Sequence, residues 1–414
     1  MITEYVSSIF AIMVICYAII MYGLGTFFQL YLGKYFVKKD YSYQPTVSVM
    51  LSCFNEGETV YHTIKSMRES NYPIEKLEIL AFDDCSKDDS FAWIQKAAAE
   101  FPNIKAVKNK QNQGKAHSVL DAAKMATGEI LVGVDSDCIF HPNAIKELMA
   151  CFAEPKIAAV GGRVGVKNSN VNWLTRYQTV SYALSFILLK SVENIFRKIQ
   201  CLSGPLVAIR RECFFEVAPQ VQRRHFLGVK VTNGEDRALT QMLLRAGYST
   251  YLNIDSLCWT TVPTKLSEYV RQQLRWRRSA IGQWLDALVR LPVMLKNNTT
   301  LSALFSLMPV FVLMSWILLV ITSWISGNLI ETLNRVVIFH VIISPFIALF
   351  YNFFAKRYFK EDSLESTYAL SIGLIVSSLW FPFSGVVITI FALCTLDDAG
   401  WVTRAEPENN IIKD

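Results

Sequence analysis

The sequence predicts an α/β fold, a mostly parallel sheet with helices on both faces, set between apolar segments that fit a membrane. Residues 46–264 alternate strand-like runs with helical spacing of apolar residues, which is typical of a parallel sheet covered by helices. Apolar runs at residues 6–32 and 301–396 lie on either side. The chain of 414 residues is 52% hydrophobic and only 18% charged, which is too apolar for a soluble protein of this length.

The first apolar run predicts a retained membrane anchor over residues 1–33. Residues 6–32 are long enough to cross a hydrocarbon core of about 30 Å, and they lack the basic start and cleavage site of a secretory signal. Lys34, Lys38 and Lys39 follow directly, so the positive-inside rule places the globular part in the cytoplasm. The nine cysteines have no paired spacing, which suits a reducing compartment and provides no CxxC metal motif.

The segments after the globular part are predicted to lie at or in a membrane. Residues 265–291 have aromatic and apolar residues at helical intervals among several arginines, which indicates a helix at the membrane surface. Residues 301–325 are long enough to span a membrane and residues 336–355 to span back. The last run, 367–396, is broken by "FPFSG" and fits one kinked span or a hairpin. The expected organisation is an anchor (1–33), a cytoplasmic α/β domain (34–264), interfacial helices (265–300), membrane helices (301–396) and a cytoplasmic tail (397–414).

Three strand-like runs end in polar residues. These are "TVSVMLSCFNEGETV" at 46–60, "LEILAFDDCSKDDS" at 77–90 and "EILVGVDSDCIFHP" at 129–142, which we interpret as the first, second and third strand–helix units. Ligands of such sheets gather at the carboxyl ends of the strands. We therefore expect the three polar clusters to meet at one rim.

Asp135 and Asp137 are the strongest candidates for a metal site. They stand one residue apart at the end of an apolar strand, and side chains of an extended chain alternate, so both point to the same side. Two close carboxylates need a cation, and this partial set of hard oxygen ligands suits Mg²⁺ or Mn²⁺ completed by substrate phosphates. A solvated turn is the ordinary alternative for an isolated DxD, but the strand context favours the metal. His141 is given no role.

Two further polar clusters fit a nucleotide. Asp83 and Asp84 end the second strand, where a carboxylate can accept a hydrogen bond from a base or ribose; a helix cap is the alternative, and it is preferred for Ser86 and Asp88. "NQGKAH" supplies a glycine that allows close backbone approach and a lysine, Lys115, that can meet phosphate.

Seven motifs together resemble a known family. "VSVMLSCFNE", "FDDCSKD", "NQGKAHS", "VDSD", "CLSGPLVAIRR", "NGEDRAL" and "QQLRW" are similar in order and spacing to those of processive, membrane-integrated family 2 glycosyltransferases. Within that family they resemble above all hyaluronan synthases and the chitin-oligosaccharide synthases of nodulation-factor pathways. The likeness covers residues 45–276, and "LCTLDDAGWVTR" at 393–404 resembles the tail motif of hyaluronan synthases. It implies a GT-A (Rossmann-like) cytoplasmic domain inserted between transmembrane and interfacial helices.

The resemblance implies how a donor is held. Asp84 would bind the uracil, Lys115 the nucleotide or its phosphates, and Arg275 the diphosphate. Asp137, with Asp135, would bind the Mg²⁺ or Mn²⁺ that neutralises the leaving group. Phe54 stands where the family often has tyrosine, which removes a hydroxyl contact but keeps stacking. The implied donor-binding residues are Phe54, Asp83, Asp84, Lys115, Asp135, Arg275, Trp401, Thr403 and Arg404.

The resemblance also implies the acceptor side. Asp236 would be the general base that takes a proton from the acceptor hydroxyl during attack on the anomeric carbon. Trp276 would be a flat platform under the acceptor sugar, with a membrane-belt aromatic as the alternative. Arg277 and Arg278 are interpreted as contacts to anionic lipid headgroups. The implied acceptor-binding residues are Ser203, Gly204, Pro205, Glu235, Arg237, Gln272 and Trp276.

The implied function is a processive, inverting β-glycosyltransferase of the plasma membrane that polymerises sugars from UDP donors and couples synthesis to export. UDP-N-acetylglucosamine is the first expected donor, alternating with UDP-glucuronic acid in a hyaluronan synthase. The alternatives are a chitin-type synthase that uses UDP-N-acetylglucosamine alone, a non-processive transferase to a lipid acceptor, and a transporter or sensor with an inactive nucleotide-binding domain. The expected partners are the UDP-sugar, the growing polysaccharide and the lipid bilayer, with no nucleic acid.

Overall fold

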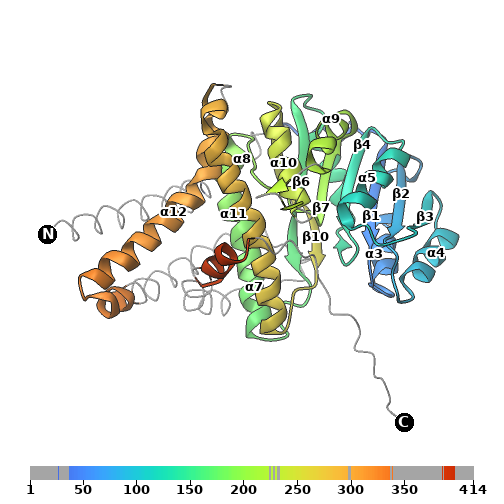
Figure 1. Ribbon diagram of the computed structural model, residues 1–414. Helices are drawn as coiled ribbons and strands as arrows, with labels where there is room; N and C mark the ends of the chain where they lie inside the picture. The colour runs from blue at the N-terminus through green and yellow to red at the C-terminus, as the bar shows by residue number, and fades with distance from the viewer. Residues whose placement is uncertain are drawn as a thin grey trace, which may run out of the picture.

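The computed structural model describes residues 27, 37–222, 225–226, 229–230, 234–296, 300–335, 338, 385 and 387–396. Figure 1 shows a sheet flanked by helices, with two long helices at one side of this α/β body. The sheet has eight strands in the order β3-β2-β1-β4-β7-β6-β10-β5. Its strands are β1 (Val47–Cys53), β2 (Leu77–Asp83), β3 (Ile104–Lys108), β4 (Ile130–Asp135), β5 (Ile139–Phe140), β6 (Ile157–Val166), β7 (Leu206–Arg210) and β10 (Ser249–Thr260). A separate hairpin joins β8 (His225–Phe226) to β9 (Val229–Lys230).

The sheet is mostly parallel, as predicted. Strand β1 pairs in parallel with β2 and β4, β2 with β3, and β6 with β10. Strand β7 lies antiparallel between β4 and β6, and β5 is antiparallel on β10. Strands β1, β2 and β4 read as nearly continuous apolar runs because helices cover both of their faces.

One detail of the predicted order is wrong. The strand β3 intervenes, so the unit that ends at Asp135 is the fourth strand–helix unit and not the third. The sequence of β3, "IKAVK", places exposed lysines between half-buried apolar residues. That alternation fits the edge position of β3 in the sheet. Such a short, lysine-bearing segment lacks the apolar run by which the other strands were identified.

The helices cover the sheet on both faces. Helix α5 packs on β1 and β2, and α9 packs on β4 and β7 while contacting both α5 and α10. These three helices, α5, α9 and α10, therefore lie side by side on one face of the sheet. The helices of the domain are α3 (Thr59–Arg68), η2 (Ile74–Lys76), α4 (Ser90–Glu100), α5 (Lys115–Met125), α6 (Ala144–Cys151), α7 (Trp173–Ala183), the π-helical η3 (Leu184–Leu189), α8 (Lys190–Ile195), α9 (Arg211–Gln222) and α10 (Glu235–Arg245).

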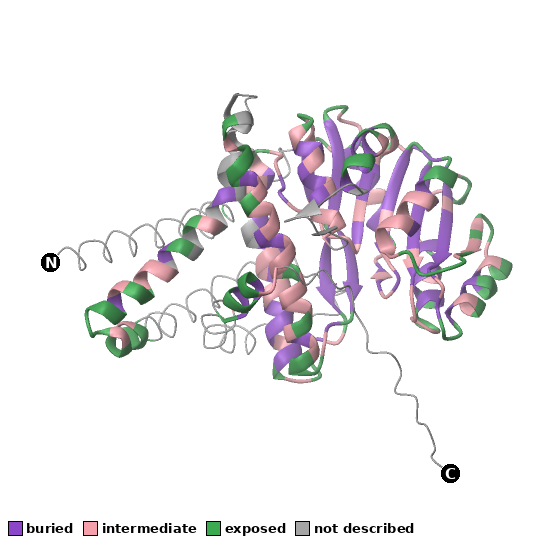
Figure 2. Ribbon diagram, viewed as in Figure 1, coloured by how far each residue is buried: buried purple, intermediate pink, exposed green. Residues whose placement is uncertain are grey.

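The core lies between the sheet and these helices. In Figure 2 the central strands are buried along most of their length, whereas exposed positions gather on the outer helices and loops. Ile79, Ile130 and Val160 are completely buried in strands, and Ile64 and Leu148 pack on them from helices with no exposed surface. Burial of this kind contributes about 1.5–3 kcal/mol for each large apolar side chain, and it holds the strand ends in a fixed arrangement.

Two long helices follow the domain. Helix α11 (Leu266–Lys296) contains the helix predicted over residues 265–291, and α12 (Thr300–Ile325), which it contacts, is the helix predicted from residue 301. Within the part of the chain that the structure describes, no helix combines the length and the apolarity that crossing a membrane requires. The predicted anchor apart from Phe27, the run 336–355 apart from Ile338, and the tail 397–414 lie outside the described residues.

Candidate active site

The predicted polar clusters meet at one rim of the sheet. Cys53 at the end of β1 pairs with Asp83 at the end of β2, and Ser52 pairs with Asp135 at the end of β4. Because the three strands are parallel neighbours, their carboxyl ends lie side by side. Phe54 follows β1 directly and is half-buried.

Asp84 is buried and organises the loop that leads to Lys115. One of its oxygens, Oδ1, accepts hydrogen bonds from Asn109 Nδ2 at 2.8 Å and from the backbone N–H of Gln113 at 3.0 Å. The other, Oδ2, accepts the backbone N–H of Gly114 at 2.7 Å. These bonds fix the start of α5, where Gly114 has a φ of 85° that favours glycine. Contact of Asp84 with a base stays a prediction.

Asp83, which precedes Asp84, has one carboxylate oxygen to which no described residue donates. Its side chain has no exposed surface, and Oδ2 accepts the backbone N–H of Ser86 at 3.2 Å. Among the described residues, nothing donates to Oδ1. A buried carboxylate oxygen without a partner is costly, and contact of this atom with a ligand stays a prediction.

Lys115 and Asp135 form an ion pair at the centre of the rim. Lys115 Nζ contacts Asp135 Oδ1 and lies 3.9 Å from Glu235 Oε1. Burial alone would lower the pKa of Lys115, but the negative charges of Asp135 and Glu235 outweigh it and raise the pKa above its usual value. Lys115 is therefore a cation at every physiological pH, positioned for the charge of a phosphate.

The two carboxylates of the DxD fit a hard divalent ion. The Asp135 side chain keeps 31% of its surface exposed, and Asp137 Oδ2 accepts a hydrogen bond from Thr260 Oγ1 at 3.4 Å. The described residues contain no group of three or more His, Cys, Asp or Glu arranged to hold a metal. Two carboxylates can hold Mg²⁺ or Mn²⁺ when water and phosphate oxygens supply the other ligands, which is how such ions are usually bound beside phosphates.

Asp236 lies near Lys115 and Asp135, on the other side of Gly204. It is the second residue of α10, and its Oδ2 accepts the backbone N–H of Gly204 at 3.2 Å while Oδ1 accepts the backbone N–H of Arg237 at 2.7 Å. A Cβ added to Gly204 would lie 3.0 Å from Lys115 Nζ, 3.7 Å from Asp135 Oδ1 and 3.9 Å from Asp236 Cβ. Glycine at position 204 thus leaves only a narrow hollow between the three charged residues, too small for a Cβ unless the Lys115 ammonium moves.

The start of α10 is also shaped by a glycine. Gly234 has a φ of 65°, and a Cβ there would overlap the Ser279 side chain of α11. Burial raises the pKa of Glu235 above its usual value, with Lys115 opposing the shift and Asp236 adding to it. The motif Gly234-Glu235-Asp236 therefore lies between α11, which Gly234 contacts, and the rim of the sheet, where Glu235 lies near Lys115.

Next to Ser203, one of the predicted acceptor-binding residues, lies a lysine that no sequence motif identified. Lys190, at the start of α8, donates to Ser203 Oγ at 3.1 Å and is only 9% exposed. Burial lowers the pKa of Lys190, which lies close to the charge of Arg237. Pro205 then leads from this turn into β7. A lysine that interrupts an apolar helix was the only signal in the sequence.

Helix α11 brings the "QQLRW" residues to the same region. Trp276 is 38% exposed, and its ring centre lies 6.4 Å from that of Tyr182 on α7. Burial raises the pKa of the Tyr182 hydroxyl, the charge of Asp137 adds to this, and Arg275 opposes it. Tyr182, which the sequence did not single out, thus lies between the DxD and α11. Gln272 has a buried Oε1 to which no described residue donates.

Arg278 has a partner within the protein. Its guanidinium donates two hydrogen bonds to Thr395 Oγ1, at 2.9 and 3.1 Å. Arg277 is only half-exposed, and burial lowers its pKa. Helix α11 thus contacts the described segment at residues 387–396, which is far away in the sequence, and contact of either arginine with lipid headgroups stays a prediction. The predicted tail residues Trp401, Thr403 and Arg404 lie outside the described residues.

Comparisons with known proteins agree with this geometry. Residues 45–279 match the model of a family described as "Glycosyltransferase like family 2". The chain is 25% identical to a hyaluronan synthase of Streptococcus pyogenes over 407 residues, which cover 96% of this chain and 90% of the relative. It is 28% identical to an N-acetylglucosaminyltransferase of Rhizobium sp. (strain N33) over 362 residues, which cover 87% of this chain and 77% of the relative.

A solved structure has a similar fold. The mannosyltransferase PcManGT from Pyrobaculum calidifontis, in complex with GDP-Man and Mn²⁺, superposes with a TM-score of 0.51 at 18% identity. The superposition covers 92% of this chain and 99% of that one. The α/β fold predicted from the sequence is therefore that of a GT-A-type transferase.

Proposed function

This chain belongs to the family 2 glycosyltransferases, and from that membership we propose that it is a processive, inverting β-glycosyltransferase that builds a polysaccharide from UDP-sugars. The first donor is UDP-N-acetylglucosamine, alternating with UDP-glucuronic acid if the product is hyaluronan. Similarity to a hyaluronan synthase and to an N-acetylglucosaminyltransferase supports this choice of donors.

One observation carries the proposal. Three charged residues from three different elements surround the hollow at Gly204: Lys115 from α5, Asp135 from β4 and Asp236 from α10. A lysine beside a DxD suits a diphosphate, and a carboxylate on the opposite side suits a hydroxyl that must lose its proton. A sugar carbon bound next to this hollow, with Lys115 and Asp135 on one side and Asp236 on the other, would thus have its leaving group on one side and a base on the other.

The reaction uses these groups in a single displacement. The acceptor hydroxyl oxygen attacks the anomeric carbon, the carbon–oxygen bond to UDP breaks, and Asp236 receives the hydroxyl proton. Attack from the face opposite the diphosphate inverts an α-linked donor into a β-glycoside. Lys115 and Arg275 bind the departing diphosphate. A divalent ion held by Asp135 and Asp137 would supply further charge neutralisation there.

We also propose the surroundings of this site. The apolar runs at residues 6–32 and 301–396 would anchor the enzyme in the plasma membrane, with residues 34–264 in the cytoplasm and 265–300 at the membrane surface. A polar glycan needs a path lined by protein through hydrocarbon, and the membrane helices would provide this path during export. The tail with Trp401, Thr403 and Arg404 would fold over the bound nucleotide.

Two alternatives use the same site. A chitin-type synthase would use UDP-N-acetylglucosamine alone, and a non-processive enzyme would pass one sugar to a lipid acceptor. The "QQLRW" segment of α11, where the Trp276 ring lies at a tilt of 55° beside that of Tyr182, favours a polymer over a single transfer because aromatic rings can pack against the faces of a sugar chain. An inactive domain of a transporter or sensor is set aside because the chain is a glycosyltransferase.

The test is synthesis by the purified full-length protein in detergent with Mg²⁺ or Mn²⁺. UDP-sugars are supplied singly and in pairs, and the products are identified by digestion with chitinase or hyaluronidase. We expect polymer that depends on UDP-N-acetylglucosamine. Polymer from that donor alone would identify the chitin-type enzyme, and a product that extracts into organic solvent would identify transfer to lipid. Absence of transfer from every UDP-sugar would contradict the proposal.

A further inference from the structure

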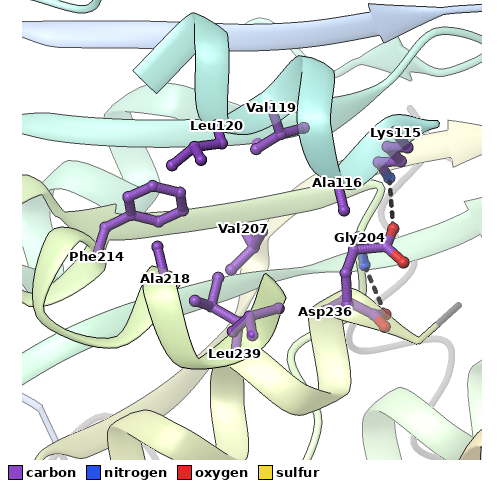
Figure 3. A pocket seen from close by; sticks show the side chains of 13 residues that line it. Lys115, Ala116, Val119, Leu120, Gly204, Val207, Phe214, Ala218, Asp236 and Leu239 are labelled. Atoms are coloured by element: carbon purple, nitrogen blue, oxygen red, sulfur yellow. Dashed lines mark hydrogen bonds and ion pairs between the residues drawn. The ribbon is translucent and has the colours of Figure 1, made fainter. Parts of the chain in front are cut away.

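An apolar pocket opens directly behind the candidate base. Figure 3 shows it between the three helices that share one face of the sheet, with Lys115, Gly204 and Asp236 at one end and apolar side chains filling the other. The apolar walls come from α5, β7, α9 and α10. They include Val119, Leu120, Val207, Phe214, Ala218 and Leu239.

The mouth of the pocket coincides with the reaction centre. Lys115, Gly204 and Asp236 line both the pocket and the narrow hollow at Gly204, and Glu235 also lines the pocket. The pocket floor runs past Gly133 of β4, where a Cβ would come 3.4 Å from Val207 Cγ1. Gly133 stands two residues before Asp135 on the same strand, so both positions belong to the same face of the sheet. Whatever enters the pocket must therefore be attached to the reacting sugar or be very close to it.

The size and chemistry of the pocket limit its occupant. Its volume is about 80 Å³. That is roughly half of an engineered apolar cavity of about 150 Å³ that binds benzene, so a sugar ring or a nucleobase does not fit, whereas a methyl or ethyl group does. The interior offers no polar partner to water beyond the mouth, and such cavities stay dry. The natural occupant is a small apolar substituent with a polar link.

We propose that this pocket is the subsite for the N-acyl group of the donor sugar, an inference that rests on the proposed function. The acyl methyl enters between Val119, Val207 and Leu239. The amide stays at the mouth, where the Lys115 ammonium can donate to its oxygen and the Glu235 carboxylate can accept from its N–H. A donor with a plain hydroxyl at this carbon leaves the pocket empty.

This assignment predicts the size of the discrimination. One methyl-sized group in an apolar pocket contributes about 1–3 kcal/mol, which corresponds to a preference of about 5–150-fold for the N-acetyl donor over its hydroxyl analogue. Equilibrium binding of UDP-N-acetylglucosamine, UDP-glucose and UDP to the full-length protein measures this preference without requiring turnover. Its result is thus independent of whether a polymer forms.

The first test fills the pocket. Val119→Phe places a ring in it, and we expect the affinity ratio of UDP-N-acetylglucosamine to UDP-glucose to fall to about one, while UDP affinity changes by less than about twofold. Val171→Phe is the matched control, because Val171 is 63% exposed and does not line the pocket. An unchanged ratio in the Val119→Phe protein, with UDP binding intact, would overturn the proposal.

The second test enlarges the pocket. Leu120→Ala should raise the affinity for UDP-N-butanoylglucosamine at least about tenfold relative to the wild-type protein. Leu148→Ala is the control, because it removes the same atoms from a fully buried position on α6 away from the pocket. No gain for the larger acyl group would reject the subsite even if Val119→Phe fails to fold.

The two proposals can fail separately. Polymer synthesis without any N-acetyl preference in binding would reject the subsite and support the proposed function. Selective binding of the N-acetyl donor without synthesis would support the subsite and contradict the proposed function.

Discussion

The backbone N–H of Gly204 donates to Oδ2 of Asp236 across 3.2 Å and so ties the turn before β7 to the first turn of α10. The other oxygen of the same carboxylate accepts the backbone N–H of Arg237. Both donors are backbone groups, so the orientation of this carboxylate, the proposed base, depends on the path of the chain.

Asp236→Asn should abolish sugar transfer and leave nucleotide binding intact. The amide keeps the size of the side chain but cannot take up the acceptor proton, so we expect the rate to fall about 10²–10⁴-fold. UDP affinity, measured by calorimetry, should stay within about twofold. Asp121→Asn, a partly exposed aspartate on α5 that pairs with Lys124, is the control for loss of one charge. Wild-type turnover in the Asp236→Asn protein would refute the assignment of the base.

Gly204→Ala should reduce turnover with little loss of stability. The added Cβ would lie 3.0 Å from Lys115 Nζ, so the ammonium must move away from the hollow. A loss of about 1.4 kcal/mol of transition-state stabilisation corresponds to about a tenfold lower rate. Initial rates and melting temperatures measured on one preparation separate the two effects. If the variant works at the wild-type rate, the sugar carbon does not react next to Gly204.

Removal of divalent metal should stop synthesis. Asp135 and Asp137 supply two oxygen ligands, too few to hold an ion tightly without the donor's phosphates. Excess chelator should therefore remove activity, and added Mg²⁺ or Mn²⁺ should restore it. Asp137→Asn should raise the metal concentration needed for half-maximal rate. Full activity in excess chelator would exclude the metal role of Asp137.

Trp276→Ala should shorten the product. The ring lies beside Tyr182 and is partly exposed, as a platform for a sugar chain would be. Its loss should raise the rate of chain release, which gel filtration of the polymer would detect. Trp276→Phe keeps an aromatic face and should retain most of the length. A membrane-belt role predicts instead weaker membrane association with unchanged product length.

Glu78 makes stability depend on pH. Burial alone would raise its pKa, but hydrogen bonds from Ser48, Thr127 and Lys105 outweigh this and lower the pKa to about 2. The stability from these bonds is present above the unfolded-state pKa and is lost as the pH falls from about 5 towards 2. Glu78→Gln should therefore destabilise the protein by up to about 3 kcal/mol at pH 7, and the difference should vanish near pH 2.

Urea unfolding at a series of pH values measures this effect. The bonds of Glu78 hold the turn before β4, since Thr127 donates to Glu78 Oε1 at 2.7 Å through its backbone N–H. Glu75→Gln, at a nearby exposed position, should show no such pH dependence. An equal destabilisation at pH 7 and pH 3 would mean that the glutamine loses packing and not the charged hydrogen bonds.

The sequence predicted the elements that have a strong local signal. The strands of residues 47–53, 77–83 and 130–135 are apolar runs ended by polar turns, and the helix of residues 265–291 has a clear period. The sequence did not predict β3 or the reversed strand β7, because each is only five residues long and depends on its neighbours in the sheet.

Local motifs identified candidate site residues, whereas contacts between distant segments left no signal. Asp135 and Asp236 stood out by their motifs, whereas Lys190 and Tyr182 lie near the candidate site because α7 and α8 pack beside the rim. The partner of Arg278, Thr395, was not predicted because it lies 117 residues away in sequence. Periodicity in one segment contains no information about such a partner.

The close approach of Gly234 to Ser279 has a mechanical consequence. No room remains there for even one methyl group, so α11 presses against the backbone that precedes Glu235 and Asp236. A displacement of α11 towards α10 would meet this backbone through the short Ser279 side chain, two residues before the proposed base Asp236. We therefore expect movement of this long helix to change the position of Asp236.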